Sequence, residues 1–600
     1  MKIMTKYTTK QTFLLGGCLF FKFIYFDFLW CLQTTFTSFS TFELYINGVF
    51  VTLLLLLPFV CAHRRWVQTV VLLAVDGLLV ANLMYARTYF AAIPLDSYAA
   101  VGNLSDFGAS VWDSVRWTDV VFFLSTLFGV LYGNRLRRLR QPSRDQGSYL
   151  RLAGSYLLLL AGFGLVSFAL SLRKGGFVAS FEYLQGANKH TCTTPEYTVF
   201  GSLLHDALKK REVYTPETAA QIRTWLDARP PYRALPDTIP ERTNLVIILA
   251  ESFESWVLEQ RVEGQEITPN LNRLLADPHT LYAPHVLTQT KGGRSIDGQM
   301  LLMTGMLPIA EGAYSIKYPQ HTFHSLPEAM KAKFGTRTYL MTVDKPIVWN
   351  QQVVAKSFGY DTLISKKDFV DGEKIGMYGR QKLGDVPFLR QCAEKMAHGE
   401  IARDGESYCL LCVTYSGHNP FKLPEALQQL HFPADYPERM RDYMNTAHYT
   451  DRAIGAFVDY LRARPDYDRT LIVITGDHEG LTADRADLCA SPRGKGIVSD
   501  KQFTPFIVLN SPVALRYDAV MGQADMYTTL LNLLKLDDAP WKGMGQSILD
   551  PSRPPFAVGM YNNPVGDLSK VSPAEEQRAK QAYTISDLMI RFDYFGRDSE

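Results

Sequence analysis

Five apolar segments in the first third of the chain limit what it can fold into. A transmembrane helix needs about 20 mostly apolar residues. The segments are 12–33, 42–62, 67–85, 118–132 and 149–172, of which the fourth is short. We interpret the first as an uncleaved helix and not as a signal peptide, because it lacks a small-residue cleavage site and further segments follow. The sequence therefore predicts an integral membrane protein with an α-helical bundle of about five transmembrane helices.

Charged residues in and between these segments bear on function and orientation. Lys22 and Asp27 lie within the first segment, where they either have a function or face the bundle interior or the membrane edge. Lys and Arg are concentrated in alternate connections, starting with the N-terminus. Because basic loops stay in the cytoplasm, five spans place everything after Leu172 outside. We expect a multi-pass protein of the cytoplasmic membrane with an extracytoplasmic catalytic domain.

Beyond the membrane segments the chain has the pattern of an α/β domain. Continuous apolar runs of strand length occur at 244–250, 338–342, 408–413, 471–475 and 506–509, which predicts strands covered on both faces. Helical patterns such as 442–462 and 524–536 lie between them, as is typical of a mostly parallel sheet. We expect a transmembrane domain at 1–175, a juxtamembrane connector at 176–240, a catalytic domain at 241–560 and a C-terminal extension at 561–600.

The charge and cysteine content exclude some classes of partner and site. The chain has 62 basic and 60 acidic residues, a net charge of +2, which gives no indication of a nucleic-acid partner. Its eight cysteines form no metal-binding cluster. Five of them lie in the soluble part, which leaves room for one or two disulfides but not for pairing of all five within one chain.

Polar side chains follow four of the predicted strands, where ligands of α/β sheets bind. Glu251 follows the first strand, and Asp477 and His478 follow the fourth. Two carboxylates and an imidazole suit Mn²⁺, Mg²⁺ or Zn²⁺ and leave a coordination position open for catalysis. The alternatives are a solvated strand end for Glu251 and a capped turn for Asp477. The other two strands are followed by His418 and by Asp344, Trp349 and Asn350.

A candidate nucleophile, Ser295, stands at the expected start of a helix. Gly292, Gly293 and Arg294 precede it, and an apolar helix-like stretch at 300–306 follows. A serine at this place is often only an N-cap. A helix N-terminus also stabilises anions, so Arg294 could contact a phosphate there, and metal coordination could activate the hydroxyl. Asp297 is interpreted as a first-turn residue that complements the helix dipole.

These motifs occur in an order that resembles a known family. The matching segments are 244–252, 292–297, 349–350, 357–361, 416–421, 475–480, 522–525 and 543–547. In combination they resemble the lipoteichoic acid synthase-like phosphoglycerol/phosphoethanolamine transferases of the alkaline-phosphatase/sulfatase superfamily, and the likeness covers nearly the whole chain.

The resemblance implies a role for each candidate residue. One divalent metal, Mn²⁺ with Mg²⁺ or Zn²⁺ as alternatives, is expected on Glu251, Asp477, His478 and Ser295. Ser295 is expected to form a phospho-serine, where the family commonly has threonine. Arg294 and His418 are the further catalytic candidates, and the substrate-binding residues are expected to be Asp344, Trp349, Asn350 and His418.

Two departures from the family and one contrast with sulfatases narrow the expected function. Gln351 stands where glycerolphosphate-polymerising members have arginine, and Thr342 stands where they have histidine. Glutamine cannot recognise phosphate in the bidentate way of arginine, which argues against polymerisation. Ser295 is followed by Ile-Asp-Gly-Gln, without the x-P-x-R of formylglycine sulfatases.

We therefore expect a membrane-bound transferase that moves phosphoglycerol or phosphoethanolamine from a phospholipid donor to an envelope glycan or lipid acceptor. The alternatives are a phosphodiesterase, phosphatase or sulfatase-like hydrolase, and a non-catalytic envelope sensor that binds lipid.

Overall fold

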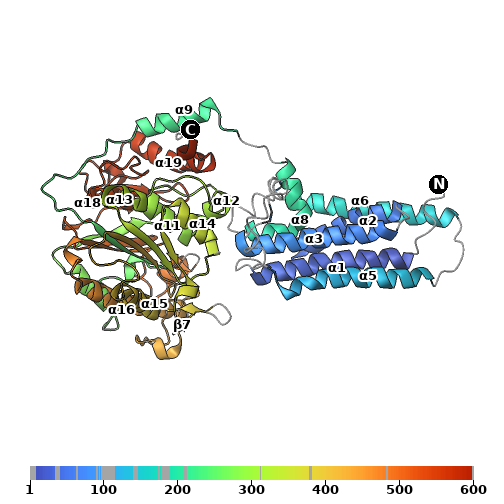
Figure 1. Ribbon diagram of the computed structural model, residues 1–600, viewed down its shortest axis with the longest axis horizontal. Helices are drawn as coiled ribbons and strands as arrows, with labels where there is room; N and C mark the ends of the chain where they lie inside the picture. Colours follow the sequence, from blue (N-terminus) through green and yellow to red (C-terminus); the bar gives the residue numbers. More distant parts are fainter. Residues whose placement is uncertain are drawn as a thin grey trace. The chain divides into compact units, whose positions relative to one another are not determined.

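The chain forms two compact units, Met1–Val213 and Tyr214–Glu600, in the computed structural model (Figure 1). The structure describes residues 9–33, 41–61, 65–89, 92–93, 95, 115–138, 146–172, 176, 190–208, 213–310, 312–346, 348–376, 381–481 and 484–597. The expected connector is divided between the units, because α8 (His190–Leu208) packs against helices of the first and α9 (Pro216–Asp227) against α19 (Pro573–Arg591) of the second.

All five apolar segments of the first unit form helices. These are α1 (Thr9–Gln33), α2 (Phe42–Cys61), α3 (Arg65–Tyr89), α5 (Val120–Arg138) and α6 (Gln146–Leu172). Three contain stretches long and apolar enough to cross a membrane, namely Phe13–Leu32, Trp66–Tyr85 and Gly154–Leu172, whereas the apolar parts of α2 and α5 are shorter. The membrane prediction is confirmed in this form, and the count of five spans stays a prediction.

The charges inside α1 face the interior of the helix bundle. Lys22 and Asp27 are both buried. Lys22 forms an ion pair with Asp76 of α3, and its ammonium also donates to Phe122 O at 2.8 Å and Ser125 Oγ at 2.6 Å on α5. The buried charge therefore joins three helices. Among the basic residues that predict the orientation, Lys2, Lys6, Arg64, Arg140 and Arg144 lie outside the described residues. The orientation stays a prediction.

A nine-stranded mixed sheet forms the centre of the second unit. Its strands are β1 (Asn244–Ala250), β4 (Leu281–Leu287), β5 (Arg337–Thr342), β6 (Thr362–Ile364), β9 (Tyr408–Val413), β10 (Thr470–Gly476), β11 (Phe503–Leu509), β12 (Leu515–Arg516) and β13 (Met521–Gly522). The order is β12-β4-β11-β10-β1-β9-β5-β6, with β13 beside β4. Only the β11 pairings, with β10 and with β4, are antiparallel, so the predicted mostly parallel sheet is confirmed.

Helices cover both faces of this sheet (Figure 1). One layer contains α11 (Ser295–Thr304), α13 (Leu326–Phe334), α14 (Gln351–Ser357) and α18 (Gln523–Leu533), and the other contains α15 (Asp385–Ala397) and α16 (Glu438–Arg462). A further helix, α10 (Pro269–Leu275), packs against α16 in the second layer. Alternate residues of β1 enter the two cores: Leu245, Ile247 and Leu249 the first, and Val246, Ile248 and Ala250 the second. This two-sided burial explains why β1 is continuously apolar.

Short elements complete the second unit. They are the strand pairs β2 (Arg261–Val262) with β3 (Gln265–Glu266), β7 (Lys374–Ile375) with β8 (Lys382–Leu383) and β14 (Phe556–Val558) with β15 (Pro564–Gly566), and the helices α12 (Tyr314–Lys317), α17 (Arg485–Ala490) and α20 (Tyr594–Arg597). Cys392, Cys409, Cys412 and Cys489 are free thiols, and the side chain of Cys192 lies outside the described residues. The four described cysteines of this unit therefore form no disulfide.

Candidate active site

The register of the sheet brings the predicted strand ends to one edge. Leu249 of β1 is level with Thr475 of β10 on one side and with Val413 of β9 on the other. Thr342 of β5 is level with Val413. Side chains that follow these strands therefore stand in a row, in the order β10, β1, β9 and β5.

Three buried side chains at this edge form a cluster with metal-binding character. One ligand atom each of Glu251, Asp477 and His478 lies within 4.8 Å of the others. Asp477 Oδ1 accepts hydrogen bonds from the backbone N–H of Ser252 at 2.7 Å and of His478 at 2.8 Å. Asp477 Oδ2 is buried and has no hydrogen-bond partner among the described residues. A buried carboxylate oxygen left in this state fits a cation.

The pKa values of the cluster also favour a metal site. Burial raises the pKa of Asp477 to about 6, and burial together with the charge of Asp477 raises that of Glu251. Burial, followed by repulsion from Arg294, lowers the pKa of His478 to about 4. The imidazole is therefore neutral, the form that ligates metals, and a divalent cation would offset the cost of keeping two carboxylates ionised here. The residues present fit a metal.

Ser295 is the first residue of α11, and its hydroxyl lies against this cluster. Its Oγ donates to Glu251 Oε2 at 3.1 Å and lies 3.2 Å from His478 Nε2. Arg294, not Ser295, occupies the N-cap position, with φ of 50°. Because the hydroxyl does not cap the helix, it is available for chemistry.

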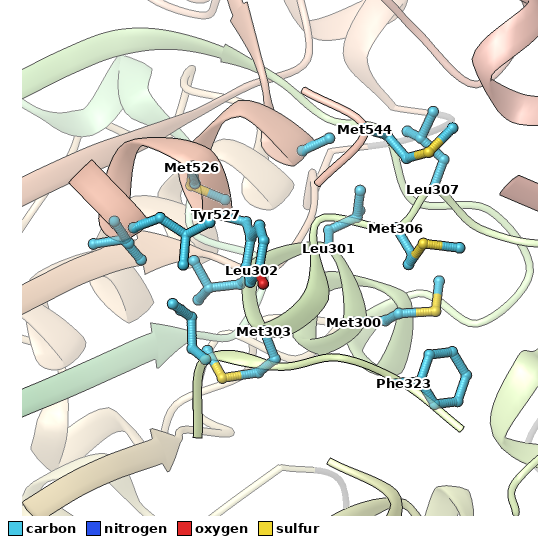
Figure 2. Close-up of a cluster of buried hydrophobic side chains, with 14 of the residues drawn as sticks. Met300, Leu301, Leu302, Met303, Met306, Leu307, Phe323, Met526, Tyr527 and Met544 are labelled. Atoms are coloured by element: carbon cyan, nitrogen blue, oxygen red, sulfur yellow. The ribbon is translucent and has the colours of Figure 1, made fainter. Parts of the chain in front are cut away.

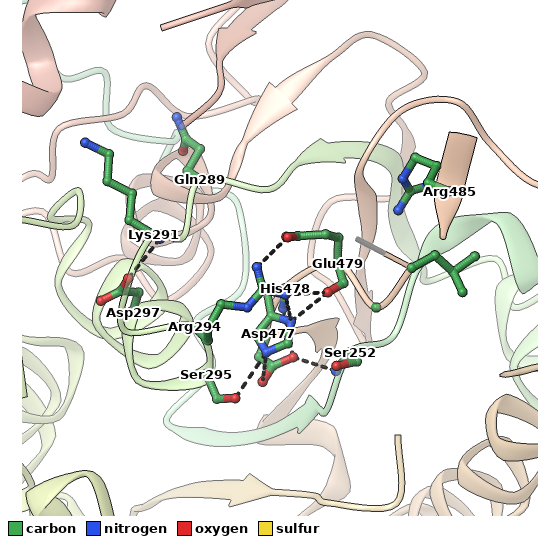
Figure 3. A network of polar contacts seen from close by, with 12 residues as sticks. Ser252, Gln289, Lys291, Arg294, Ser295, Asp297, Asp477, His478, Glu479 and Arg485 are labelled. Atoms are coloured by element: carbon green, nitrogen blue, oxygen red, sulfur yellow. Dashed lines mark hydrogen bonds and ion pairs between the residues drawn. The ribbon is translucent and has the colours of Figure 1, made fainter. Parts of the chain in front are cut away.

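Arg294 holds the metal-ligand candidate His478 in place (Figure 3). Its guanidinium forms an ion pair with the Glu479 carboxylate, donates to Glu479 O at 2.8 Å and lies 3.0 Å from His478 Nδ1. Glu479, which sequence reasoning missed although it stands in the 475–480 motif, is therefore part of the site. Asp297 lies in the first turn of α11, as expected. It also accepts from the N–H groups of Lys291 and Gly293, both at 2.9 Å, and so holds the loop before Ser295.

The expected substrate residues of β9 and β5 form a second group on the same edge. His418 is exposed and stacks on Tyr415 at a centroid distance of 5.2 Å. Asp344 forms an ion pair with Lys382, whose Nζ lies 4.1 Å from the centre of the Tyr415 ring. Lys382 was missed, and no local sequence pattern marks it, because only the fold brings β8 to the segment after β5.

Trp349 and Asn350 have a left-handed backbone, each with φ of 55°, which is costly for such residues and frequent at functional sites. Trp349 is half-buried, and Asn350 is buried and donates to Ser315 O at 3.2 Å. The next residue, Gln351, exchanges hydrogen bonds with Gln299 of α11 at 2.9 and 3.3 Å. The amide that replaces the family's arginine is therefore occupied by a partner within the protein.

Comparison with known proteins now places the chain. Residues 1–182 match the model of the lipoteichoic acid synthase N-terminal domain, and residues 243–536 match the model named Sulfatase. Lipoteichoic acid synthase 2 of Bacillus subtilis (strain 168) is 25% identical over 553 residues, which cover 86% of this chain and 82% of the relative. The lipoteichoic acid synthase of Staphylococcus aureus (strain USA300) is 22% identical over 621 residues, 94% of this chain and 92% of the relative.

The chain belongs to the lipoteichoic acid synthase-like family. The crystal structure of lipoteichoic acid synthase LtaP from Listeria monocytogenes supports the fold, with a TM-score of 0.50, 18% identity and coverage of 62% of this chain and 98% of LtaP. The chain is thus a membrane phosphotransferase, a headgroup transferase of the alkaline phosphatase superfamily, whose members generally bind a divalent metal.

Proposed function

We propose that this transferase moves phosphoglycerol or phosphoethanolamine from a membrane phospholipid to an envelope glycan or lipid acceptor, with its catalytic domain outside the cytoplasmic membrane. The observation that carries the proposal is the position of Ser295 Oγ, 3.1 Å from Glu251 Oε2 and 3.2 Å from His478 Nε2. A hydroxyl beside metal-ligand candidates at a helix N-terminus is arranged for attack on a phosphodiester.

Glu251, Asp477, His478 and the Ser295 hydroxyl would hold one divalent metal, Mn²⁺ first, with Mg²⁺ and Zn²⁺ as alternatives. When bound, the metal supplies Lewis-acid stabilisation of phosphoryl charge and lowers the pKa of the serine hydroxyl. The unpartnered Asp477 Oδ2 supports this assignment. Glu479 O lies 2.8 Å from His478 Nδ1 and Arg294 lies 3.0 Å from the same atom, so together they orient the ring with Nε2 facing the cluster.

The reaction takes two steps in this proposal. Ser295 Oγ attacks the donor phosphorus and gives its proton to the carboxylate of Glu251. The bond between phosphorus and the diacylglycerol oxygen breaks. His418, which is exposed at the same edge, protonates the diacylglycerol oxygen. In the second step His418 takes the proton of an acceptor hydroxyl, whose oxygen attacks the phosphorus of the phospho-serine. The bond between phosphorus and Ser295 Oγ breaks, and Glu251 returns its proton to the serine oxygen. Asp344, Trp349 and Asn350 bind the transferred alcohol.

The test uses the full-length protein in detergent with labelled phosphatidylglycerol and, separately, phosphatidylethanolamine. Diacylglycerol release is expected from at least one donor with the native protein and with Ser295→Thr, and is expected to fall at least about a thousandfold with Ser295→Ala. No release from either donor, or release that survives Ser295→Ala, rejects the proposal.

Product analysis separates the remaining alternatives. Transfer gives a product that contains the added acceptor, whereas a phosphodiesterase or phosphatase gives the free phospho-alcohol or phosphate whether or not an acceptor is present. A non-catalytic sensor would bind lipid without releasing diacylglycerol. Metal content measured before and after Asp477→Ala tests the ligand assignment independently, and an unchanged content would contradict it.

A further inference from the structure

A basic cavity of about 330 Å³ lies away from the candidate active site. Its walls come from the segment after α9, the N-terminal part of α18, the turn at 542–547 and α19. None of Glu251, Ser295, Asp477 or His478 lines it. The volume is at the lower end of the range for small-molecule sites, about 300–1,000 Å³.

The cavity wall carries more positive than negative charge. Arg229, Arg233, Lys542, Arg553 and Arg578 line it, against the carboxylates Asp525 and Asp550. Both carboxylates are already paired, Asp525 with Arg553 and Asp550 with Arg233 at 3.5 Å. In the described part of the chain, no carboxylate lies within ion-pair distance of Arg229, Lys542 or Arg578.

The guanidinium of Arg578 is the most available of the three charges. Arg229 donates to Gly543 O at 2.9 Å and lies over Trp541, and Lys542 donates to Ala539 O at 2.8 Å. Arg578 makes no side-chain hydrogen bond to a described residue and lies 6.0 Å from the centre of the Trp225 ring. Glu575, which is close enough to interact with Arg578, has its carboxylate on Ser572.

We propose that this cavity is a second binding site, for the phosphate group of a small phosphate ester or free phosphate, held by Arg229 and Arg578. Partly buried guanidinium groups without a carboxylate partner suit an anion, and phosphate matches the paired donors of Arg578. Arg229 contributes mainly its charge, because its Nε donates to Leu226 O at 3.2 Å and its Nη1 to Gly543 O at 2.9 Å. The aromatic walls of Trp225 and Tyr232 offer contact area for the alcohol part of an ester.

Hydrogen bonds through two glutamines connect this cavity to the active site. Gln289 lines the cavity, and its backbone N–H donates to Gln523 Oε1 at 2.7 Å. Gln523 Nε2 in turn donates to Asp477 O at 2.7 Å. The two sites are therefore separate, but two glutamines connect them.

The experiment titrates the full-length Ser295→Ala protein, stripped of metal with EDTA, with inorganic phosphate and with glycerol phosphate. Removing metal and nucleophile keeps the active site from contributing. Arg578→Met is expected to weaken binding of both probes about tenfold or more, and Arg578→Lys to recover part of it, because the charge is restored. Arg390→Met, at an exposed arginine of α15, is the matched control and should bind as the parent does.

The outcomes are distinct. Tighter binding of glycerol phosphate than of phosphate assigns the site to an ester, and equal binding assigns it to free phosphate. Absence of binding in the parent, or affinities that Arg578→Met leaves unchanged, overturns the proposal. Arg229→Met is a supporting variant only, because its contacts with Gly543 and Trp541 also stabilise the fold.

Discussion

Asp477 and His478 respond to pH in different ways, although they are adjacent. Burial raises the pKa of Asp477 to about 6, so its protonated form is populated in the metal-free protein below that pH. Burial and Arg294 lower the pKa of His478 to about 4, so the imidazole is unprotonated above that pH. Protons should therefore compete with a metal for the carboxylate and not for the imidazole.

We predict that metal affinity falls as the pH is lowered through about 6 and levels off above it. Each proton displaced per metal ion gives a loss of about tenfold per pH unit on the acid side, and the slope is at least this steep because the pKa of Glu251 is raised as well. Calorimetric titration with Mn²⁺ at a series of pH values measures the slope. Asp477→Asn, which removes the titrating carboxylate, should bind weakly and with a shallower slope. An affinity independent of pH around 6 would contradict the assignment.

The Gln299–Gln351 pair allows a second test at the residue scale. Gln299→Leu leaves the buried amide of Gln351 without its partner, which costs about 1–3 kcal/mol of unfolding free energy. The double variant Gln299→Leu/Gln351→Leu removes both amides and should recover most of this loss. Thermal unfolding of the three proteins measures it, and a Gln299→Leu variant as stable as the parent would refute the coupling.

Residues of this site differ in how well the sequence predicts them. Glu251, Asp477 and His478 follow continuous apolar runs, so the strand-end rule alone groups them. The partners of Arg294 and Asp344 could not be predicted in this way. Glu479 follows the same strand as Asp477 and His478, but its pairing with Arg294 depends on long-range packing. Lys382 lies on a short strand whose place no local pattern marks.

At the scale of elements, α11 is held where Ser295 meets the metal-ligand candidates. Met300, Leu301, Leu302 and Met303 are buried around the helix, against Met526 and Tyr527 of α18 among others (Figure 2). Its polar start approaches β10 closely, because a Cβ at Gly298 would lie 2.6 Å from the backbone oxygen of Asp477. This packing fixes the position of α11 relative to Asp477.

We predict that Gly298→Ala lowers transfer activity about a hundredfold while the chain still folds. The added methyl must push α11 away from Asp477, and a displacement of about 1 Å at a reacting group is enough for such a loss. Diacylglycerol release, with thermal unfolding in parallel, measures both effects. Gly162→Ala on α6 is the control, since a Cβ there meets nothing within 4 Å. Full activity of Gly298→Ala would show that the contact does not position Ser295.

The sequence predicts some strands of the sheet but not all of them, and not their directions. Each of the five predicted strands is present within a few residues, because two-sided burial gives continuous apolar runs. β4 was missed: Pro284 and His285 interrupt its apolar run, and proline argues against a strand interior. The antiparallel direction of β11 was not predicted either, since apolar content carries no information on strand direction.

Three membrane-domain helices meet at the Lys22–Asp76 pair. Removing only the lysine should lower stability, whereas removing both charges should not. Lys22→Met leaves Asp76 buried without its cation, which destabilises the fold by about 3–5 kcal/mol, whereas Lys22→Met/Asp76→Leu removes both charges and should restore stability. The yield of folded protein in detergent and its thermal unfolding measure the effect. Equal stability of the single and double variants would contradict a structural role for the pair.

At the scale of the whole molecule, the chain divides after Val213. The second unit should fold and bind metal by itself, and the first should give it access to membrane lipid. Tyr214–Glu600 contains the complete sheet, both of its cores and every candidate active-site residue, whereas the first unit contributes the apolar helices. Residues 214–600 alone should therefore fold and bind metal with the affinity of the full chain.

The same fragment should cleave a short-chain soluble phospholipid but lose most activity on phospholipid in bilayers, because a soluble domain meets a membrane-held donor only by collision. For each protein, at equal metal loading, the rate on the bilayer donor is divided by the rate on the soluble donor. The value for the full chain relative to that for the fragment measures the contribution of the membrane unit. Reduced metal affinity in the fragment would show that the first unit supports the site itself. Undiminished cleavage of the bilayer donor would show that the helices only anchor the chain.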